Sequence, residues 1–191
     1  RACNISSWAH DHAIASGVGT AALQLGRALG CTVYGTSRTQ EKLDRCTGLG
    51  MHHGLVAERG EFAKQIMTLT QGRGVDVIVD LVGGEYIKED LKACAERARV
   101  VVVGLSAGIS ADINLAMLLQ KRIAIIGTVM RSRPMHEKIE ARIALERHIV
   151  PGFVSGSLKP VIDKIFAMDE APAAHAYLAS NASFGKVLLK I

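Results

Sequence analysis

The sequence predicts an α/β fold built on a doubly wound parallel sheet. Short β-branched runs alternate with helix-like patterns along most of the chain, and this order is typical of parallel strands joined by helices. Hydrophobic residues make up 49% of the 191 residues but aromatic residues only 4%. The core is therefore expected to consist of Val, Ile, Leu and Ala, as in sheets that helices cover on both faces.

Each predicted strand is a short apolar run, and each predicted helix repeats its apolar residues every three or four positions. Residues 75–82 (VDVIVDLV) and the four valines of residues 100–103 are the clearest strands, and each runs into glycine. In chain order we predict a helix at 20–29, a strand at 32–35, helices at 41–49 and 62–69, a strand at 75–82, a helix at 86–97, a strand at 100–103, a helix at 115–120, a strand at 123–130 and a helix at 134–150.

The last part of the chain has a different pattern. Residues 158–166 predict a strand interrupted by Pro160, residues 169–180 a helix with Asp169 as N-cap, and residues 186–191 a final strand. These pieces are too small to form a core of their own. We therefore expect one domain over residues 1–156 and, over residues 157–191, a segment that belongs to a second domain.

Charge, cysteine pattern and hydropathy exclude several classes of protein. The net charge is +5, but the 23 Lys and Arg residues are scattered, which disfavours nucleic-acid binding. The four cysteines have no metal-like spacing and do not suggest a disulfide framework, so we expect a cytoplasmic protein. We expect no membrane span or signal peptide. The chain begins with Arg1 and not Met, which suggests a fragment or a processed product.

A turn of small residues precedes the first predicted helix. Ser16, Gly17, Val18 and Gly19 leave the backbone N–H groups accessible, and the helix behind them directs its positive end to the same place. Three further predicted strands also end in small residues, at 36–37, 83–84 and 104–106. Tight packing turns would explain each of them singly, but four together favour a dinucleotide cofactor at the carboxyl ends of the strands.

The second of these strand ends favours NADPH over NADH. An NAD site is expected to carry Asp or Glu about 20 residues after the glycines. This chain has Thr36, Ser37 and Arg38 there, with Lys42 one helical turn further on. Hydroxyl groups and a guanidinium suit the adenosine 2′-phosphate, which Arg can bind in a bidentate manner. The alternative is that Arg38 is an ordinary solvated cation.

Other chemistries lack their motifs. The sequence has no Tyr-x-x-x-Lys pair, no P-loop and no G-x-S-x-G element. His10, Asp11 and His12 could suggest a metal, as could the pair at 52–53, but loop histidines are the favoured interpretation and we predict no metal site. Asp80 is interpreted as a local hydrogen-bonding residue. Arg131-Ser132-Arg133 could bind phosphate or a partner, or be a solvated loop, and we identify no catalytic residue.

Taken together, the chain resembles the zinc-independent quinone oxidoreductase branch of the medium-chain dehydrogenase/reductase superfamily, which includes zeta-crystallin. Its fold would be a Rossmann domain with a tail that returns to a GroES-like domain absent from this chain. The similar stretches are residues 12–29 (HAIASGVGTAALQLGRAL), 41–43, 72–84 (GRGVDVIVDLVGG), 102–105, 131–134 and 184–188 (FGKVL).

The resemblance implies NADPH-dependent reduction of quinones or enone-type carbonyls, with hydride passing directly from the nicotinamide and without a metal. It implies a homodimer that pairs the strand of residues 123–130, from Ile123 to Met130. The implied cofactor contacts are Ser16, Gly17, Val18 and Gly19 with pyrophosphate, Ser37, Arg38 and Lys42 with the 2′-phosphate, Gly104 and Leu105 with the nicotinamide, and Asn181, Gly185 and Lys186 closing over it.

The sequence departs from the family pattern just before the turn. Ile14 stands where the family has Gly or Ala, and residues 1–11 (RACNISSWAHD) lack the usual apolar first strand. We therefore expect an altered, short or shifted central strand and a chain that is inactive by itself. The alternative to an oxidoreductase fragment is a catalytically silent NADPH-binding or dimerisation module.

Overall fold

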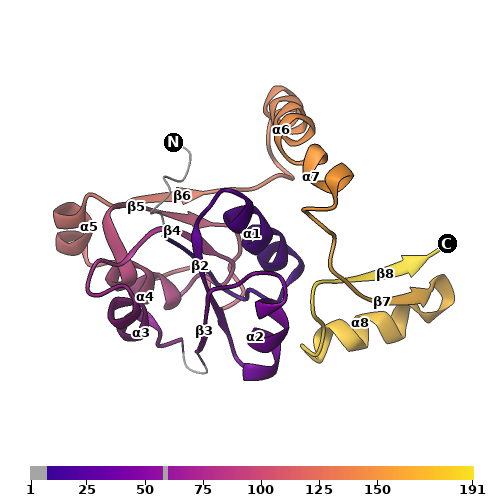
Figure 1. The fold of residues 1–191 in the computed structure, drawn as a ribbon, viewed down its shortest axis with the longest axis horizontal. Helices are drawn as coiled ribbons and strands as arrows, with labels where there is room; N and C mark the ends of the chain where they lie inside the picture. The colour runs from indigo at the N-terminus through magenta and orange to yellow at the C-terminus, as the bar shows by residue number, and fades with distance from the viewer. Residues whose placement is uncertain (1–7, 58–59) are drawn as a thin grey trace.

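We describe the chain from a computed structural model, which places residues 8–57 and 60–191. Within these residues, six parallel strands form one sheet in the order β3-β2-β1-β4-β5-β6. Figure 1 shows α1 and α2 on one side of this sheet and α3, α4 and α5 on the other. The predicted doubly wound α/β fold is thus confirmed. The strands are β1 (Trp8–Asp11), β2 (Thr32–Ser37), β3 (His53–Val56), β4 (Val75–Asp80), β5 (Cys94–Val102) and β6 (Ala124–Gly127).

Helices connect successive strands and pack a core on each face of the sheet. The helices are α1 (Gly17–Ala28), α2 (Gln40–Thr47), α3 (Ala63–Leu69), α4 (Tyr86–Ala93), α5 (Leu115–Lys121), α6 (Met135–His148) and α7 (Val150–Ser155). Leu23 of α1 and Leu43 of α2 pack with Ile14 and Val33 in one core. The other core lies under α3 and α4, and Ile66, Ile78 and Leu91 are among its fully buried residues.

The end of the chain forms a small parallel sheet of its own, made of β7 (Ile162–Ala167) and β8 (Lys186–Lys190) with the short η1 (Met168–Glu170) and α8 (Ala171–Ala179) between them. In Figure 1 this unit lies beside α1 and α2. Polar contacts join the two parts. The Gln24 amide of α1 donates to the carbonyl oxygen of Lys159 at 2.9 Å and accepts from its N–H at 2.9 Å.

Asp163 of β7 makes a second connection between the two parts. Its carboxylate accepts hydrogen bonds from the Arg45 guanidinium at 3.1 Å, the Tyr177 hydroxyl at 2.7 Å and the Phe184 N–H at 3.0 Å. Burial by itself raises the pKa of Asp163, but the hydrogen bonds from Tyr177, Phe184 and Arg45 outweigh it, and the net pKa is lowered. The ionised carboxylate therefore fastens the C-terminal unit to α2.

The structure corrects two predicted elements and adds a strand that was not predicted. The helix expected at residues 86–97 ends at Ala93, and β5 begins at Cys94, because pairing with β4 overrides the helix propensity of the following residues. Arg97 has a φ of 59° where the register shifts. Strand β3 was not predicted, and the expected helix at residues 134–150 continues as a separate α7.

Two further findings concern the start of the chain. The central strand is present as the short β1, which agrees with the expected short strand: all four of its residues pair with β2, and three of them, Ala9 to Asp11, also pair with β4. The expectation for the histidines is wrong. His10 and His12 do not lie in an exposed loop but are fully buried, His10 in β1 and His12 directly after it. Residues 1–7 of the stretch expected to lack a strand lie outside the described residues.

Cys31 is disulfide-bonded, although no disulfide was expected. No helix in the described part of the chain has the length and hydropathy needed to cross a membrane.

Candidate cofactor-binding site

The turn between β1 and α1 has the geometry of an anion-binding helix start. Ser16 is the N-cap of α1, and its hydroxyl accepts a hydrogen bond from the Gly19 N–H at 3.0 Å. The first N–H groups of a helix have no partner within the helix, and the helix dipole adds positive potential at the same end. Val18 is 43% exposed on this turn. The turn can therefore present backbone donors to a pyrophosphate, as the sequence predicted.

Close packing behind the turn depends on Gly19 and Ile14. A Cβ on Gly19 would lie 2.6 Å from the carbonyl oxygen of Ala13, so only glycine lets α1 approach this closely. Ala13 has a φ of 50°, and this residue, not Ile14, adopts the left-handed conformation. Ile14 is fully buried, and its Cδ1 atom lies 2.1 Å from where a Cβ on Gly35 would stand. Ile14 therefore fills space against β2 beneath the turn.

Residues of the C-terminal unit cover the turn from the other side. The Gly185 N–H donates to the carbonyl oxygen of Ala15 at 2.7 Å, and Gly185 and Ser16 form a parallel β-bridge. The aliphatic part of Lys186 lies over Gly17, because a Cβ on Gly17 would be 2.3 Å from Lys186 Cε. The structure thus brings Gly185 and Lys186 to the turn at residues 16–19, the candidate phosphate turn.

A group of cations lies after β2. Arg38 is exposed, and within the described residues it forms no ion pair. The Lys42 ammonium donates to the carbonyl oxygen of Asn181, which joins these two predicted residues. Burial lowers the pKa of Lys42, and the nearby Arg38 guanidinium lowers it further. Two neighbouring positive groups at this position would favour a bound phosphate.

The hydroxyl of Thr36 does not join this group. Thr36 is buried, and its Oγ1 atom lies 2.9 Å from His12 Nδ1, on the other face of the sheet. Ser37, the next residue, accepts a hydrogen bond from the Thr39 N–H at 3.4 Å. Because successive strand residues point to opposite faces, Ser37 and Thr36 lie on different faces of the sheet, and only Ser37 can join the group of cations.

The ends of β4 and β5 meet at the same edge of the sheet. Asp80 Oδ1 accepts hydrogen bonds from the N–H groups of Val82 and Gly83 at 2.7 and 2.9 Å, which confirms its local structural role. A Cβ on Gly104 would lie 2.5 Å from the carbonyl oxygen of Leu81, so glycine is needed for this close approach. Leu105 is 52% exposed next to it. Gly104 and Leu105 therefore lie at the carboxyl edge of the sheet, close to the end of β4.

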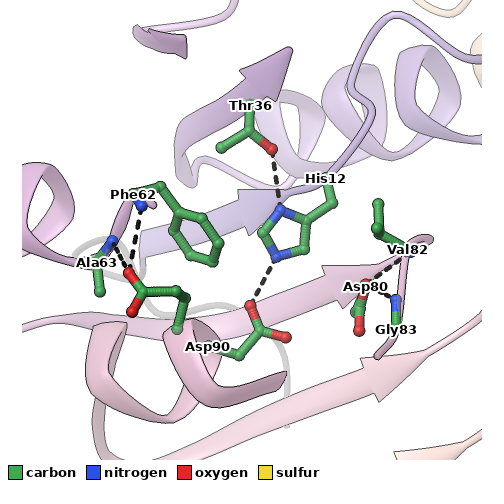
Figure 2. Close-up of polar contacts among 9 residues, drawn as sticks. His12, Thr36, Phe62, Ala63, Asp80, Val82, Gly83 and Asp90 are labelled. Carbon is green, nitrogen blue, oxygen red and sulfur yellow. Dashed lines mark hydrogen bonds and ion pairs between the residues drawn. The ribbon is translucent and has the colours of Figure 1, made fainter. Parts of the chain in front are cut away.

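The structure also reveals a buried polar cluster that the sequence reasoning missed. His12 Nε2 lies 2.6 Å from Asp90 Oδ1, and both side chains are fully buried. Figure 2 shows His12 between Thr36 and Asp90, with Asp80 on the neighbouring strand β4. His10 and His12 share one face because they are two residues apart, and Phe62 packs against both rings. The spacing of His10 and His12, two residues apart, is the sequence pattern from which this cluster could have been recognised.

The sequence profile of the zinc-binding dehydrogenase family matches residues 17–145. Among similar proteins, a quinone oxidoreductase of Rattus norvegicus is 30% identical over 93% of this chain and 53% of its own length. A 2-haloacrylate reductase of a Burkholderia species is 28% identical over 93% of this chain and 54% of its own length. The chain thus spans about half the length of these relatives.

A solved structure supports the same relationship. The Escherichia coli quinone oxidoreductase complexed with NADPH superposes with a TM-score of 0.80 at 27% identity, covering 97% of this chain and 57% of that one. The matched region includes the sheet, the phosphate turn and the C-terminal unit, since nearly all of the chain is covered.

Proposed function

The chain belongs to the zinc-binding dehydrogenase family, on its quinone oxidoreductase-like side, and from this premise we propose that it binds NADPH for the reduction of a quinone or enone-type carbonyl. When bound, the reduced nicotinamide supplies the hydride, and no metal takes part in its transfer. The main support is the Ser16 to Gly19 turn at the start of α1, which Gly185 and Lys186 cover.

The proposed cofactor contacts follow the order of the strands. The backbone N–H groups of the turn bind the pyrophosphate, and Lys186 reaches the same anion from the C-terminal unit. Ser37, Arg38 and Lys42 bind the adenosine 2′-phosphate, and Lys42 is held beside Asn181. Gly104 and Leu105 leave room for the nicotinamide. These residues bind and orient the cofactor, and we assign no catalytic side chain to this chain.

Fluorescence titration of the purified chain with NADPH and NADH tests the proposal. We expect tighter binding of NADPH, and we expect Arg38→Ala to weaken NADPH binding by about tenfold, the order of one charged hydrogen bond, without affecting NADH. Arg147→Ala, which removes an exposed cation from α6, is the matched control and should leave both affinities unchanged. Equal binding of the two cofactors would refute the 2′-phosphate site, and no binding would refute the cofactor site.

We also propose that the chain forms a homodimer through β6 and that residues 157–191 join a second, GroES-like domain of a longer protein. β6 lies at the edge of the sheet, and Ile126 in this strand is 43% exposed; Met130, in the segment after the strand, is 55% exposed. An uncovered apolar edge favours pairing with a second copy. Sedimentation analysis should find a dimer, and Ile126→Lys should shift it to monomer. A monomeric parent chain would refute this assembly.

A further inference from the structure

Three acidic or imidazole side chains from separate elements converge inside the sheet core. His12 follows β1, Asp80 ends β4 and Asp90 lies on α4, and all three are fully buried. One potential ligand atom from each lies within 4.8 Å of the other two. Figure 2 shows the Asp90 carboxylate below the His12 ring, with Asp80 to one side of both. The three residues thus bring one potential ligand atom each into the same small region of the core.

The cluster has unsatisfied acceptor atoms that point to a missing positive charge. Asp80 Oδ1 is used by the N–H groups of Val82 and Gly83, but its Oδ2 atom has no hydrogen-bond partner among the described residues. Asp90 Oδ2 is likewise without a partner in that part of the chain. A buried carboxylate oxygen with no partner costs free energy, and burial raises the pKa of Asp90 although His12 opposes the change.

We propose that His12 Nε2 and one carboxylate oxygen each from Asp80 and Asp90 bind a single divalent first-row transition-metal ion. Two carboxylates and a neutral imidazole balance the charge of such an ion. Metal–ligand bonds of about 2.0–2.1 Å place tetrahedral ligand atoms about 3.3 Å apart. The ion replaces the proton between His12 Nε2 and Asp90 Oδ1, and their 2.6 Å separation widens by less than 1 Å.

The surroundings of His12 suit metal binding. Its Nδ1 atom lies 2.9 Å from the Thr36 hydroxyl oxygen, which can accept a hydrogen bond from Nδ1–H and so leave Nε2 free for the metal. The ring packs against Phe62 and Tyr86, with centroids 4.6 and 5.1 Å away, so its orientation is fixed. The Thr36 hydroxyl is therefore compatible with the Nδ1–H tautomer that coordination through Nε2 requires, and the ring contacts fix the direction of the imidazole.

The donor set identifies the class of ion. Imidazole nitrogen with carboxylate oxygens suits Zn²⁺, Co²⁺ or Mn²⁺, whereas a thiolate would favour softer ions. Cys94 is also buried in this core, and burial raises the pKa of its thiol to about 12, which keeps it protonated. The ion would hold β1, β4 and α4 together, independently of cofactor binding.

Cobalt titration tests the site directly. The chain is purified with a chelator, freed of it, and incubated with Co²⁺ both as the native protein and during refolding from denaturant, because a buried site fills as the chain opens or folds. We expect one Co²⁺ per chain, visible d–d absorption of nitrogen and oxygen ligation, no near-ultraviolet thiolate band, and a higher unfolding temperature with the metal.

Variants separate this site from adventitious binding. Asp90→Asn should weaken Co²⁺ binding at least about tenfold, and Thr36→Val should weaken it about 10- to 100-fold by removing the support of His12. Asp112→Asn, which changes an exposed carboxylate, is the matched control and should bind like the parent. If Asp90→Asn does not fold, Thr36→Val decides. The proposal is refuted if neither preparation binds stoichiometric Co²⁺, if a thiolate band appears, or if Thr36→Val binds as tightly as the parent.

Discussion

Ile14 and Gly35 provide a quantitative test of how the region beneath the phosphate turn is packed. Ile14 is fully buried, so Ile14→Ala should lower the free energy of unfolding by about 2–5 kcal/mol. Gly35→Ala places a methyl group 2.1 Å from Ile14 Cδ1 and should cost about 1–3 kcal/mol through overpacking. If the two side chains compete for one space, the alanine methyl at position 35 partly fills the cavity left by Ile14→Ala.

The double variant should therefore lose less stability than the sum of the two single variants, by about 1 kcal/mol or more. Urea unfolding followed by circular dichroism gives the three free-energy differences, provided that the m-values remain equal. Gly26→Ala is a suitable control, because its Cβ would stand 3.1 Å from Val33 and away from Ile14. Strict additivity of Ile14→Ala and Gly35→Ala would refute the shared space.

Three other perturbations test contacts around the site. The pKa of Asp163 is lowered in the folded protein, so its stabilising contribution is present above its unfolded pKa of about 3.9 and is lost as pH falls through the folded pKa. On acidification below about pH 4, the parent should therefore lose more free energy of unfolding than Asp163→Asn does. In Gly17→Ala the new methyl group meets only the flexible side chain of Lys186, so the thermal unfolding temperature should change little. Fluorescence titration should nevertheless find NADPH binding at least about tenfold weaker. Glu89→Ala removes the acceptor of two N–H groups at the start of α3 and should lower the free energy of unfolding in urea by about 1–2 kcal/mol. An unchanged urea midpoint would contradict this capping role.

The sequence predicts the fold well where apolar periodicity is strong and local. The valine-rich strand β4 and helix α1 appear close to their expected positions because glycine turns bound them. It fails where tertiary pairing decides the outcome. The residues that begin β5 have good helix propensity, and only their pairing with β4 makes them extended. The short β3 carries too few apolar residues for its pattern to be recognised.

The site is predictable to a similar extent. A turn of small residues and the cations after β2 can be recognised along the chain, since each is a local pattern. The approach of Gly185 and Lys186 to this turn is implied only by the family resemblance, because no local sequence pattern relates them to a turn about 170 residues earlier. The buried cluster escaped prediction since Asp90 reaches His12 only through the packing of α4 on the sheet, at a separation of 78 residues.

The alternation of side chains along β2 sends neighbouring residues at the carboxyl edge of the sheet to different faces. Ser37 remains on the side of α1, whereas Thr36 turns to the face that contains His12 and two carboxylates. A one-residue register shift would exchange these roles, so the pairing of β1 with β2 fixes both sites at once. The sites nevertheless share no polar side chain. Arg38→Ala and Asp90→Asn therefore probe separate chemistry, and the outcome of one experiment does not depend on the outcome of the other.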